Sequence, residues 1–267
     1  MVKSISLHDT TFIIPVRIDS LIRLENLLAV IRFLRTIHCR IIIIESVTSP
    51  LNVTKRFLPK DRNICYMPII DNNVIYYRTH YINVALESVT TPYVAVWDAD
   101  VVVSISQIND SIETLRKGEC DVSFPYDGTF LNTDYIFRSD YLVNHDIGKL
   151  TRYKSYFNKL YGKNFVGGGF IINKDKYILA GKENENFYGW GPEDLDRVQR
   201  WEAMGYKIHR SKGPMFHLCH PRDINGNMRS KIHHDLCMEQ LQKSKYASHD
   251  NIILTKKIRR RHEHIRR

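Results

Sequence analysis

The sequence predicts an α/β fold in which a single mixed central sheet is flanked by helices. Strand-like and helix-like segments alternate through the first hundred residues, and the strand-like segments are continuous apolar runs. Such runs are typical of parallel strands that are covered on both faces and joined by right-handed crossovers. The chain has 267 residues, 43% of them hydrophobic, which is enough for a complete core.

The elements of the first half follow from local patterns. Residues 11–15 (TFIIP) predict a short buried strand that ends at Pro15, because proline lacks a backbone N–H. Residues 21–37 predict a helix with Ser20 as its N-cap, since leucine and isoleucine recur there at helical spacing. The other elements expected here are strands at residues 40–46, 63–67 and 93–97 and a helix at residues 74–88.

The second half is less periodic and richer in Tyr, Asn and Gly. It predicts strands at residues 170–172, 206–209 and 214–218 and helices at residues 174–180 and 192–204. No internal repeat or low-complexity linker interrupts the chain. We therefore expect one domain over residues 1–234, with halves at 1–115 and 116–234, followed by a helical and basic tail at 235–267.

The charge of the chain is unevenly distributed. Lys and Arg number 39 and Asp and Glu 29, and residues 255–267 alone hold seven Lys or Arg and one Glu. The nearly balanced remainder suits small anionic ligands such as nucleotides and requires no nucleic-acid groove. For the tail we expect either a solvated segment or a peripheral contact with anionic lipid.

The cysteines and the hydropathy pattern bear on the compartment. Five scattered cysteines, with no C-x-x-C pair, favour reduced thiols in a cytosol over a disulfide framework. The first residues lack the apolar stretch of a signal peptide, and no run approaches the roughly 18–20 apolar residues of a membrane span. We expect a cytoplasmic protein, at most peripheral at the inner face of the membrane.

Polar side chains follow three of the predicted strands at the point where each strand ends. Arg17 and Asp19 follow the first strand, Glu45 lies at the end of the second, and Asp98 and Asp100 follow the strand YVAVW. In sheets of this kind, ligands bind beyond the carboxyl ends of the strands. These residues are therefore expected to meet in one crevice.

The pair Asp98-Ala99-Asp100 has three interpretations. Two carboxylates after a strand can approach one Mg²⁺ or Mn²⁺ ion together with ligand phosphate. They can also be ordinary turn or helix-capping residues. A third interpretation is a phosphatase nucleophile at Asp98, but that motif usually opens its domain, whereas nearly a hundred residues precede it here.

A second constellation lies between residues 164 and 220. The run Gly167 to Gly169 permits a close approach of backbone to ligand. Trp190, Glu193 and Asp194 combine an aromatic face with two acids at the start of a helix, a combination that suits a sugar site. The acids alone could also favour the positive helix N-terminus.

The segment His217-Leu218-Cys219-His220 follows a predicted strand. Imidazole is a good ligand for Mn²⁺ and for later transition metals, so a histidine here could complete a site begun by Asp100. The histidines could equally be ordinary core or surface residues. Zinc is disfavoured because no second thiolate lies at ligand spacing.

Taken in order, these pieces resemble metal-dependent glycosyltransferases of the GT-A fold. They look most like the β-1,4-galactosyltransferase family and related bacterial capsule or lipopolysaccharide enzymes. The matching segments are IIPVRIDS, RTHYINVALESVTTPYVAVWDAD, FVGGGFIINKDKYILAG, FYGWGPEDLD and HLCHPRD. The first half of the domain would then be the nucleotide-binding half and the second the acceptor and catalytic half.

The resemblance implies an inverting transfer of galactose or N-acetylgalactosamine from a UDP-sugar to the hydroxyl of a glycan or lipid-linked glycan, in surface polysaccharide biosynthesis. It assigns the general base to Asp194 and the binding of Mn²⁺ (or Mg²⁺) to Asp100, His220 and His217. The donor nucleotide is assigned to Pro15, Arg17, Asp19, Glu45, Arg78 and Asp98, and the sugar and acceptor to Gly167, Gly168, Trp190 and Glu193.

One departure from the family concerns Asp19, which stands where the animal enzymes have a second arginine. Asp19 or Glu45 could instead accept a hydrogen bond from the uracil N–H. The alternatives to a transferase are a D-x-D phosphatase, a basic nucleic-acid-binding protein and a degenerate transferase that only binds glycans.

Overall fold

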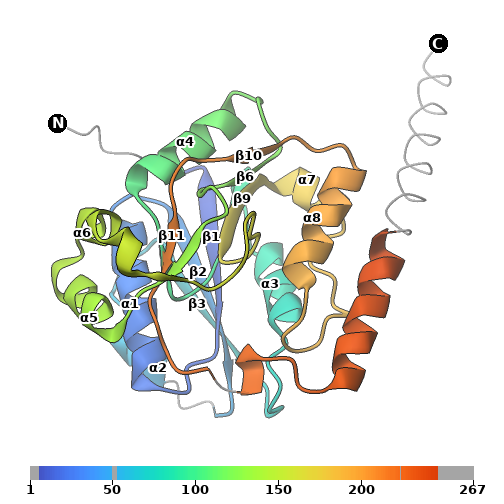
Figure 1. Cartoon of the computed structure of the whole chain (residues 1–267), viewed down its shortest axis with the longest axis horizontal. Coiled ribbons are helices and arrows are strands. Elements are labelled where there is room, and N and C mark those ends of the chain that lie inside the picture. The colour runs from blue at the N-terminus through green and yellow to red at the C-terminus, as the bar shows by residue number, and fades with distance from the viewer. Residues whose placement is uncertain (1–5, 50–52, 223, 246–267) are drawn as a thin grey trace.

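A seven-stranded mixed sheet forms the centre of the molecule. The computed structural model describes residues 6–49, 53–222 and 224–245. In Figure 1, α1, α5 and α6 lie on one side of the sheet and α3, α7 and α8 on the other, with strand order β10-β6-β9-β4-β1-β2-β3. The expected α/β fold with a mixed central sheet is confirmed.

The sheet has a parallel part and a mixed part. Strands β1 to β4 are mutually parallel, β9 runs antiparallel between β4 and β6, and β10 is parallel to β6. The strands are β1 (Thr10–Val16), β2 (Arg40–Val47), β3 (Ile64–Ile70), β4 (Tyr93–Trp97), β6 (Val122–Phe124), β9 (Gly169–Asn173) and β10 (Ile208–Arg210).

The helices connect these strands and cover the sheet. They are α1 (Leu21–Arg35), α2 (Val53–Phe57), α3 (Arg78–Glu87), α4 (Ile105–Arg116), α5 (Tyr135–Asn144), α6 (Ile147–Arg152), α7 (Lys174–Leu179) and α8 (Glu193–Ala203), with short 3₁₀ turns at η1 (Lys154–Tyr156) and η2 (Ile224–Gly226). As expected, the Ser20 side chain caps α1 by accepting a hydrogen bond from the Arg23 N–H. Among the described residues, no helix is both long and apolar enough to cross a bilayer.

A second, smaller sheet was not predicted. Its strands are β5 (Val101–Val102), β7 (Phe130–Asn132), β8 (Asn158–Lys159) and β11 (Met215–His217), in the order β5-β11-β7-β8. Strand β11 falls within the strand predicted at residues 214–218, whereas the other three have only two or three residues each, too few to produce a periodic pattern in the sequence. The core of the molecule is therefore built on the predicted central sheet with this small sheet beside it.

Several predicted boundaries differ from the structure by one to four residues, and two of them differ for local reasons. Strand β1 does not end at Pro15 but continues to Val16, with Pro15 opposite Ile44 of β2. The pairing of β1 with β4 ends at Ile13. On that side of the strand Pro15 has no partner, so its missing backbone N–H costs no hydrogen bond there. Helix α3 begins at Arg78 rather than at Val74, because the carbonyl groups of residues 73 and 74 accept hydrogen bonds from Arg17.

The expected tail begins as a packed helix. Residues 231–245 are helical, and Cys237 and Leu241 are buried against Phe187 in a small apolar cluster of their own. The helix thus crosses the predicted boundary between residues 234 and 235. The basic segment at residues 255–267 lies outside the described residues. All five cysteines are free thiols, as expected.

Candidate functional site

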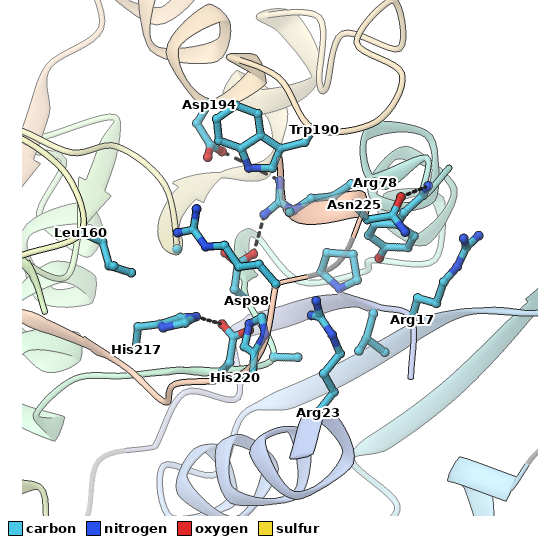
Figure 2. Close-up of a pocket in the computed structure, with 18 of the residues that line it drawn as sticks. Arg17, Arg23, Arg78, Asp98, Leu160, Trp190, Asp194, His217, His220 and Asn225 are labelled. Carbon is cyan, nitrogen blue, oxygen red and sulfur yellow. Dashed lines mark hydrogen bonds and ion pairs between the residues drawn. The ribbon is translucent and has the colours of Figure 1, made fainter. Parts of the chain in front are cut away.

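A pocket of about 220 Å³ lies at the carboxyl ends of β1 and β4, beside β11 and the start of α8. Twelve of the fourteen residues proposed from the sequence line this pocket, and Figure 2 shows several of them. They are Pro15, Arg17, Asp19, Arg78, Asp98, Asp100, Gly168, Trp190, Glu193, Asp194, His217 and His220.

Glu45 and Gly167 do not line the pocket. Glu45 is buried, and its carboxylate accepts hydrogen bonds from Thr54 Oγ1 at 2.9 Å and Tyr66 Oη at 2.6 Å. The expectation that Glu45 joins the crevice was therefore wrong, because its position at a strand end does not reveal these two partners, and of the two acids offered for the uracil N–H only Asp19 lines the pocket. Gly167 instead makes room within the site, since a Cβ atom there would lie 2.6 Å from Asp194 Oδ2.

One side of the pocket holds a potential metal centre. Oxygen and nitrogen atoms of Asp100, His217 and His220 lie within 4.8 Å of one another. Asp100 Oδ2 lies 3.0 Å from His220 Nε2, and Asp100 Oδ1 lies 3.7 Å from His217 Nε2. The small sheet creates this proximity, because β5 directly follows the Asp98–Asp100 turn and pairs His217 of β11 with Val101.

Both imidazole rings are oriented by a hydrogen bond at Nδ1. His217 Nδ1 lies 2.7 Å from Asn132 Oδ1, and His220 Nδ1 lies 2.7 Å from the Pro221 carbonyl oxygen. Since each Nδ1–H has an acceptor, each Nε2 is directed toward Asp100. This is the arrangement in which outer residues fix the ring of a metal-binding histidine.

Asp100 and the two histidines change one another's pKa values. Burial alone would raise the pKa of Asp100, but the two neighbouring imidazoles hold it below its usual range. Burial opposes the charged form of His220, yet the hydrogen bond and the charge of Asp100 raise its pKa. Burial dominates at His217 and lowers its pKa to about 4, so this ring is a neutral nitrogen donor at neutral pH.

The residues present fit a divalent cation. One carboxylate oxygen and two imidazole nitrogens converge, a mixed set of donors that suits a transition-metal ion such as Mn²⁺ better than Mg²⁺, which prefers oxygen ligands. Among the described residues, this is the one group of three or more His, Cys, Asp or Glu side chains with such spacing.

Asp98 has a different environment from Asp100. Arg78 Nη2 donates a hydrogen bond of 2.7 Å to Asp98 Oδ1, and Arg78 Nη1 lies 3.8 Å from Asp194 Oδ1. Figure 2 shows Arg78 between these two acids. Burial raises the pKa of Asp98 to about 6, although Arg78 acts in the opposite direction. The pairing with Arg78 leaves Asp98 poorly placed to act as a phosphatase nucleophile.

The other side of the pocket contains the acids at the start of α8. Asp194 accepts a hydrogen bond from Arg197 Nη2, three residues further along the helix. Glu193 is buried, and its Oε2 atom has no hydrogen-bond partner among the described residues. Burial, together with the charge of Asp194, raises the pKa of Glu193 to about 8. Both acids line the pocket, so neither serves only to favour the helix N-terminus.

Several residues of the pocket were missed in the sequence. Arg23, one turn into α1, has its Nε atom 3.2 Å from Asp19 Oδ1, and Arg222 donates to Tyr161 Oη at 3.0 Å. Arg23 follows Asp19 at i+4 spacing, a signal that could have indicated it. An aromatic wall of Phe130, Tyr161 and Phe165 completes the lining, with the rings of Tyr161 and Phe165 stacked at 4.1 Å.

Comparisons with known proteins find similarity to galactosyltransferases. Residues 150–221 match the family model described as the N-terminal domain of galactosyltransferase. Beta-1,4-galactosyltransferase 7 is 26% identical over 163 residues in Mus musculus and 26% identical over 164 residues in Homo sapiens. These alignments cover 59% and 60% of this chain but only 40% of each relative, so the chain spans about two fifths of the relatives that it matches.

Two solved structures of Drosophila beta-1,4-galactosyltransferase 7 are also similar. One is the catalytic domain in complex with xylobiose, and the other is a mutant in complex with manganese, UDP-Gal and xylobiose. Each is 15% identical with a TM-score of 0.45, covering 77% of this chain and 65% of the other.

The family match and the two curated relatives support a galactosyltransferase-like protein. The resemblance to galactosyltransferases that the sequence motifs indicate is thereby confirmed.

Proposed function

We propose that this protein is a metal-dependent, inverting glycosyltransferase of the GT-A fold. It would move a sugar, galactose or N-acetylgalactosamine, from a UDP-sugar to a hydroxyl group of a glycan. One observation carries the proposal: the Asp100–His217–His220 cluster and the Asp194 carboxylate line the same pocket. The match to galactosyltransferases supports the choice of reaction class.

The arginines of the pocket suit an anionic donor. Arg17, Arg23, Arg78 and Arg222 all line it. Guanidinium groups bind phosphate through charge-assisted and often bidentate hydrogen bonds. Arg17 is held at the pocket edge by its hydrogen bonds to Ser46 Oγ and to the carbonyl groups of residues 73 and 74. A UDP moiety would be bound and oriented by these side chains.

Asp100, His217 and His220 would hold Mn²⁺ (or Mg²⁺). When bound, the cation supplies Lewis-acid stabilisation of the diphosphate leaving group. The chain prepares this site by orienting both imidazoles through Asn132 and the Pro221 carbonyl group.

Asp194 is the proposed general base. Its carboxylate would accept the proton of the acceptor hydroxyl while that oxygen attacks the anomeric carbon. Because a single displacement takes place at the face opposite the leaving group, an α-linked donor gives a β-linked product. Trp190 and the aromatic wall offer flat apolar surfaces to the sugars, and Glu193 lies beside the base.

The biological setting is a further part of the proposal. A glycan or lipid-linked glycan acceptor and a role in surface polysaccharide biosynthesis are supported by the sequence resemblance. Peripheral contact with anionic lipid through residues 255–267 is supported by their basic composition. A cytoplasmic location at the inner face of the membrane would accommodate these features.

The proposal is tested by transfer assays with a panel of UDP-, GDP- and CMP-sugars, with and without Mn²⁺. We expect transfer only from a UDP-sugar and only with the metal. Asp194→Asn should lower kcat by about 10²–10⁴-fold, the usual contribution of a general base, while UDP binding with Mn²⁺ is retained. The control is Glu202→Gln, an exposed acid on the same helix. Wild-type turnover by Asp194→Asn would remove Asp194 from the base role.

A further inference from the structure

We propose that Arg197, fixed in place by Glu183, is a positioning residue for Asp194. This inference rests on the proposed function, because it concerns the orientation of the proposed base. Arg197 is almost completely buried, with 1% of its side chain exposed. It lies three residues after Asp194 on α8 and donates from Nη2 to Asp194 Oδ1.

The other arm of the guanidinium is held by a buried carboxylate. Arg197 Nη1 donates to both oxygens of Glu183, at 2.8 Å and 2.7 Å. A guanidinium that bridges two acids in this way has a fixed orientation, because its nitrogens form a rigid planar fork. The rings of Phe170 and Trp201 pack against it, with the guanidinium carbon 4.4 Å and 5.6 Å from the ring centroids.

Three further hydrogen bonds anchor Glu183. The Tyr177 hydroxyl donates to its Oε1 atom. Its backbone is tied to α3, since Asn83 Nδ2 donates to the Glu183 carbonyl oxygen at 2.9 Å and the Glu183 N–H donates to Asn83 Oδ1 at 3.0 Å. Helix α3 also carries Arg78, which contacts Asp194 from the pocket side. The chain of contacts therefore connects the base to the helix that contributes to the donor pocket.

Asp194 is confined at both of its oxygens. Oδ1 is bound by Arg197, and Oδ2 lies so close to Gly167 that a Cβ atom there would approach it to 2.6 Å. A misplacement of about 1 Å in a reacting group can cost about 100-fold in rate. Buried ion pairs contribute little net stability, since desolvation offsets much of their attraction. The Glu183–Arg197 pair is therefore better explained by the orientation that it gives to Asp194.

Helix α8 offers a matched control for this idea. Arg200, three residues after Arg197, is also buried and pairs with a buried acid, Asp196, at 2.9 Å. It donates further to backbone carbonyl groups at residues 180 and 182 and does not line the pocket. Arg200→Lys perturbs the same helix in the same chemical way without touching the base.

The experiment compares Arg197→Lys with Arg200→Lys in the full chain. Lysine cannot hold two carboxylates with a planar fork, so kcat of Arg197→Lys should fall about 10- to 100-fold, with the donor KM and the affinity for UDP with Mn²⁺ unchanged. Arg200→Lys should lose thermal stability but keep its kcat. Glu183→Gln, which leaves Arg197 one oxygen acceptor instead of two, should also lower kcat at constant KM.

The inference is overturned if Arg197→Lys keeps wild-type kcat, or if Arg200→Lys loses as much. Should Arg197→Lys not fold, wild-type kcat in Glu183→Gln overturns it and a lowered kcat supports it. Crystal structures of the variants separate this inference from the proposed function, because they require no activity. The Asp194 carboxylate should be displaced in Arg197→Lys or Glu183→Gln and unchanged in Arg200→Lys. If the wild type transfers no sugar, the proposed function fails, and these structures still decide the positioning role.

Discussion

The two sides of the pocket hold their carboxylates with partners of different chemistry. Asp100 is paired with the imidazoles of His217 and His220, whereas Asp194 is paired with the guanidinium groups of Arg197 and Arg78. Both acids line the same pocket. Because their partners differ, the two carboxylates are suited to different chemistry.

An imidazole can exchange a proton for a metal ion, and a guanidinium cannot. His220 carries hydrogen-bond partners at both ring nitrogens, the Pro221 carbonyl at Nδ1 and Asp100 at Nε2. Binding of a divalent ion would release the proton at Nε2, as metal binding to histidine generally does. Arg197 stays protonated and has no lone pair to offer. The pocket thus has one side that can accept a cation and one that keeps a carboxylate in a fixed place.

The largest effect that tests this difference between the two sides is expected at Asp100. Asp100→Ala removes the carboxylate whose two oxygens lie beside the two imidazoles, so UDP binding with Mn²⁺ should weaken by more than about 100-fold, beyond what residues that only orient a ligand contribute. Isothermal titration with UDP, with and without Mn²⁺, measures this. Asp110→Ala is the control, because Asp110 forms another Asp–His pair, 2.8 Å from His209, outside the pocket. An unchanged affinity in Asp100→Ala would place the metal elsewhere.

The sequence could place one side of the site better than the other. A continuous apolar strand followed by polar residues locates Asp98 and Asp100 at a sheet edge, because strand ends are local features. The approach of His217 to Asp100 depends on the pairing of β5 with β11, which joins very short strands far apart in the chain. Local patterns contain no information about that pairing, so the ligand chemistry of imidazole and the family resemblance could suggest a shared site but not the contact that forms it.

The residues that hold Asp194 could not be predicted from the sequence, for a different reason. Arg197 and Glu183 are buried charges, which hydropathy patterns assign to the surface. Glu45 shows the reverse case. This acid at a strand end was expected in the pocket, but its carboxylate is bound by Thr54 and Tyr66. Which acids remain available to a ligand depends on tertiary partners that a single sequence does not reveal.

A smaller effect on the metal side is expected from Asn132. Its Oδ1 atom accepts the Nδ1–H of His217 and so directs Nε2 toward Asp100. Asn132→Ala should weaken Mn²⁺ affinity by about 10- to 100-fold, the usual cost of losing such an outer partner, measured by titration of Mn²⁺ in the presence of UDP. Asn158→Ala is the matched control, because Asn158 is exposed and lies opposite Asn132 on β8. Equal affinities in the two variants would show that His217 needs no such orientation.

The smallest predicted effect concerns Glu193, which lies beside Asp194 but has no hydrogen-bond partner at Oε2 among the described residues. Its pKa is raised from 4.5 to about 8, mainly by burial. Between these two pKa values the folded protein keeps a proton on Glu193 that the unfolded chain has lost. The free energy of unfolding therefore decreases as the pH rises toward about 8. The wild-type Tm should therefore decrease from about pH 6 to about pH 9. Glu193→Gln, which is neutral throughout, should show a smaller decrease, whereas Glu202→Gln should follow the wild type.

Parallel curves of Tm against pH for wild type and Glu193→Gln would mean that Glu193 is ionised in the folded protein. The guanidinium side of the pocket would then stabilise two carboxylates rather than one.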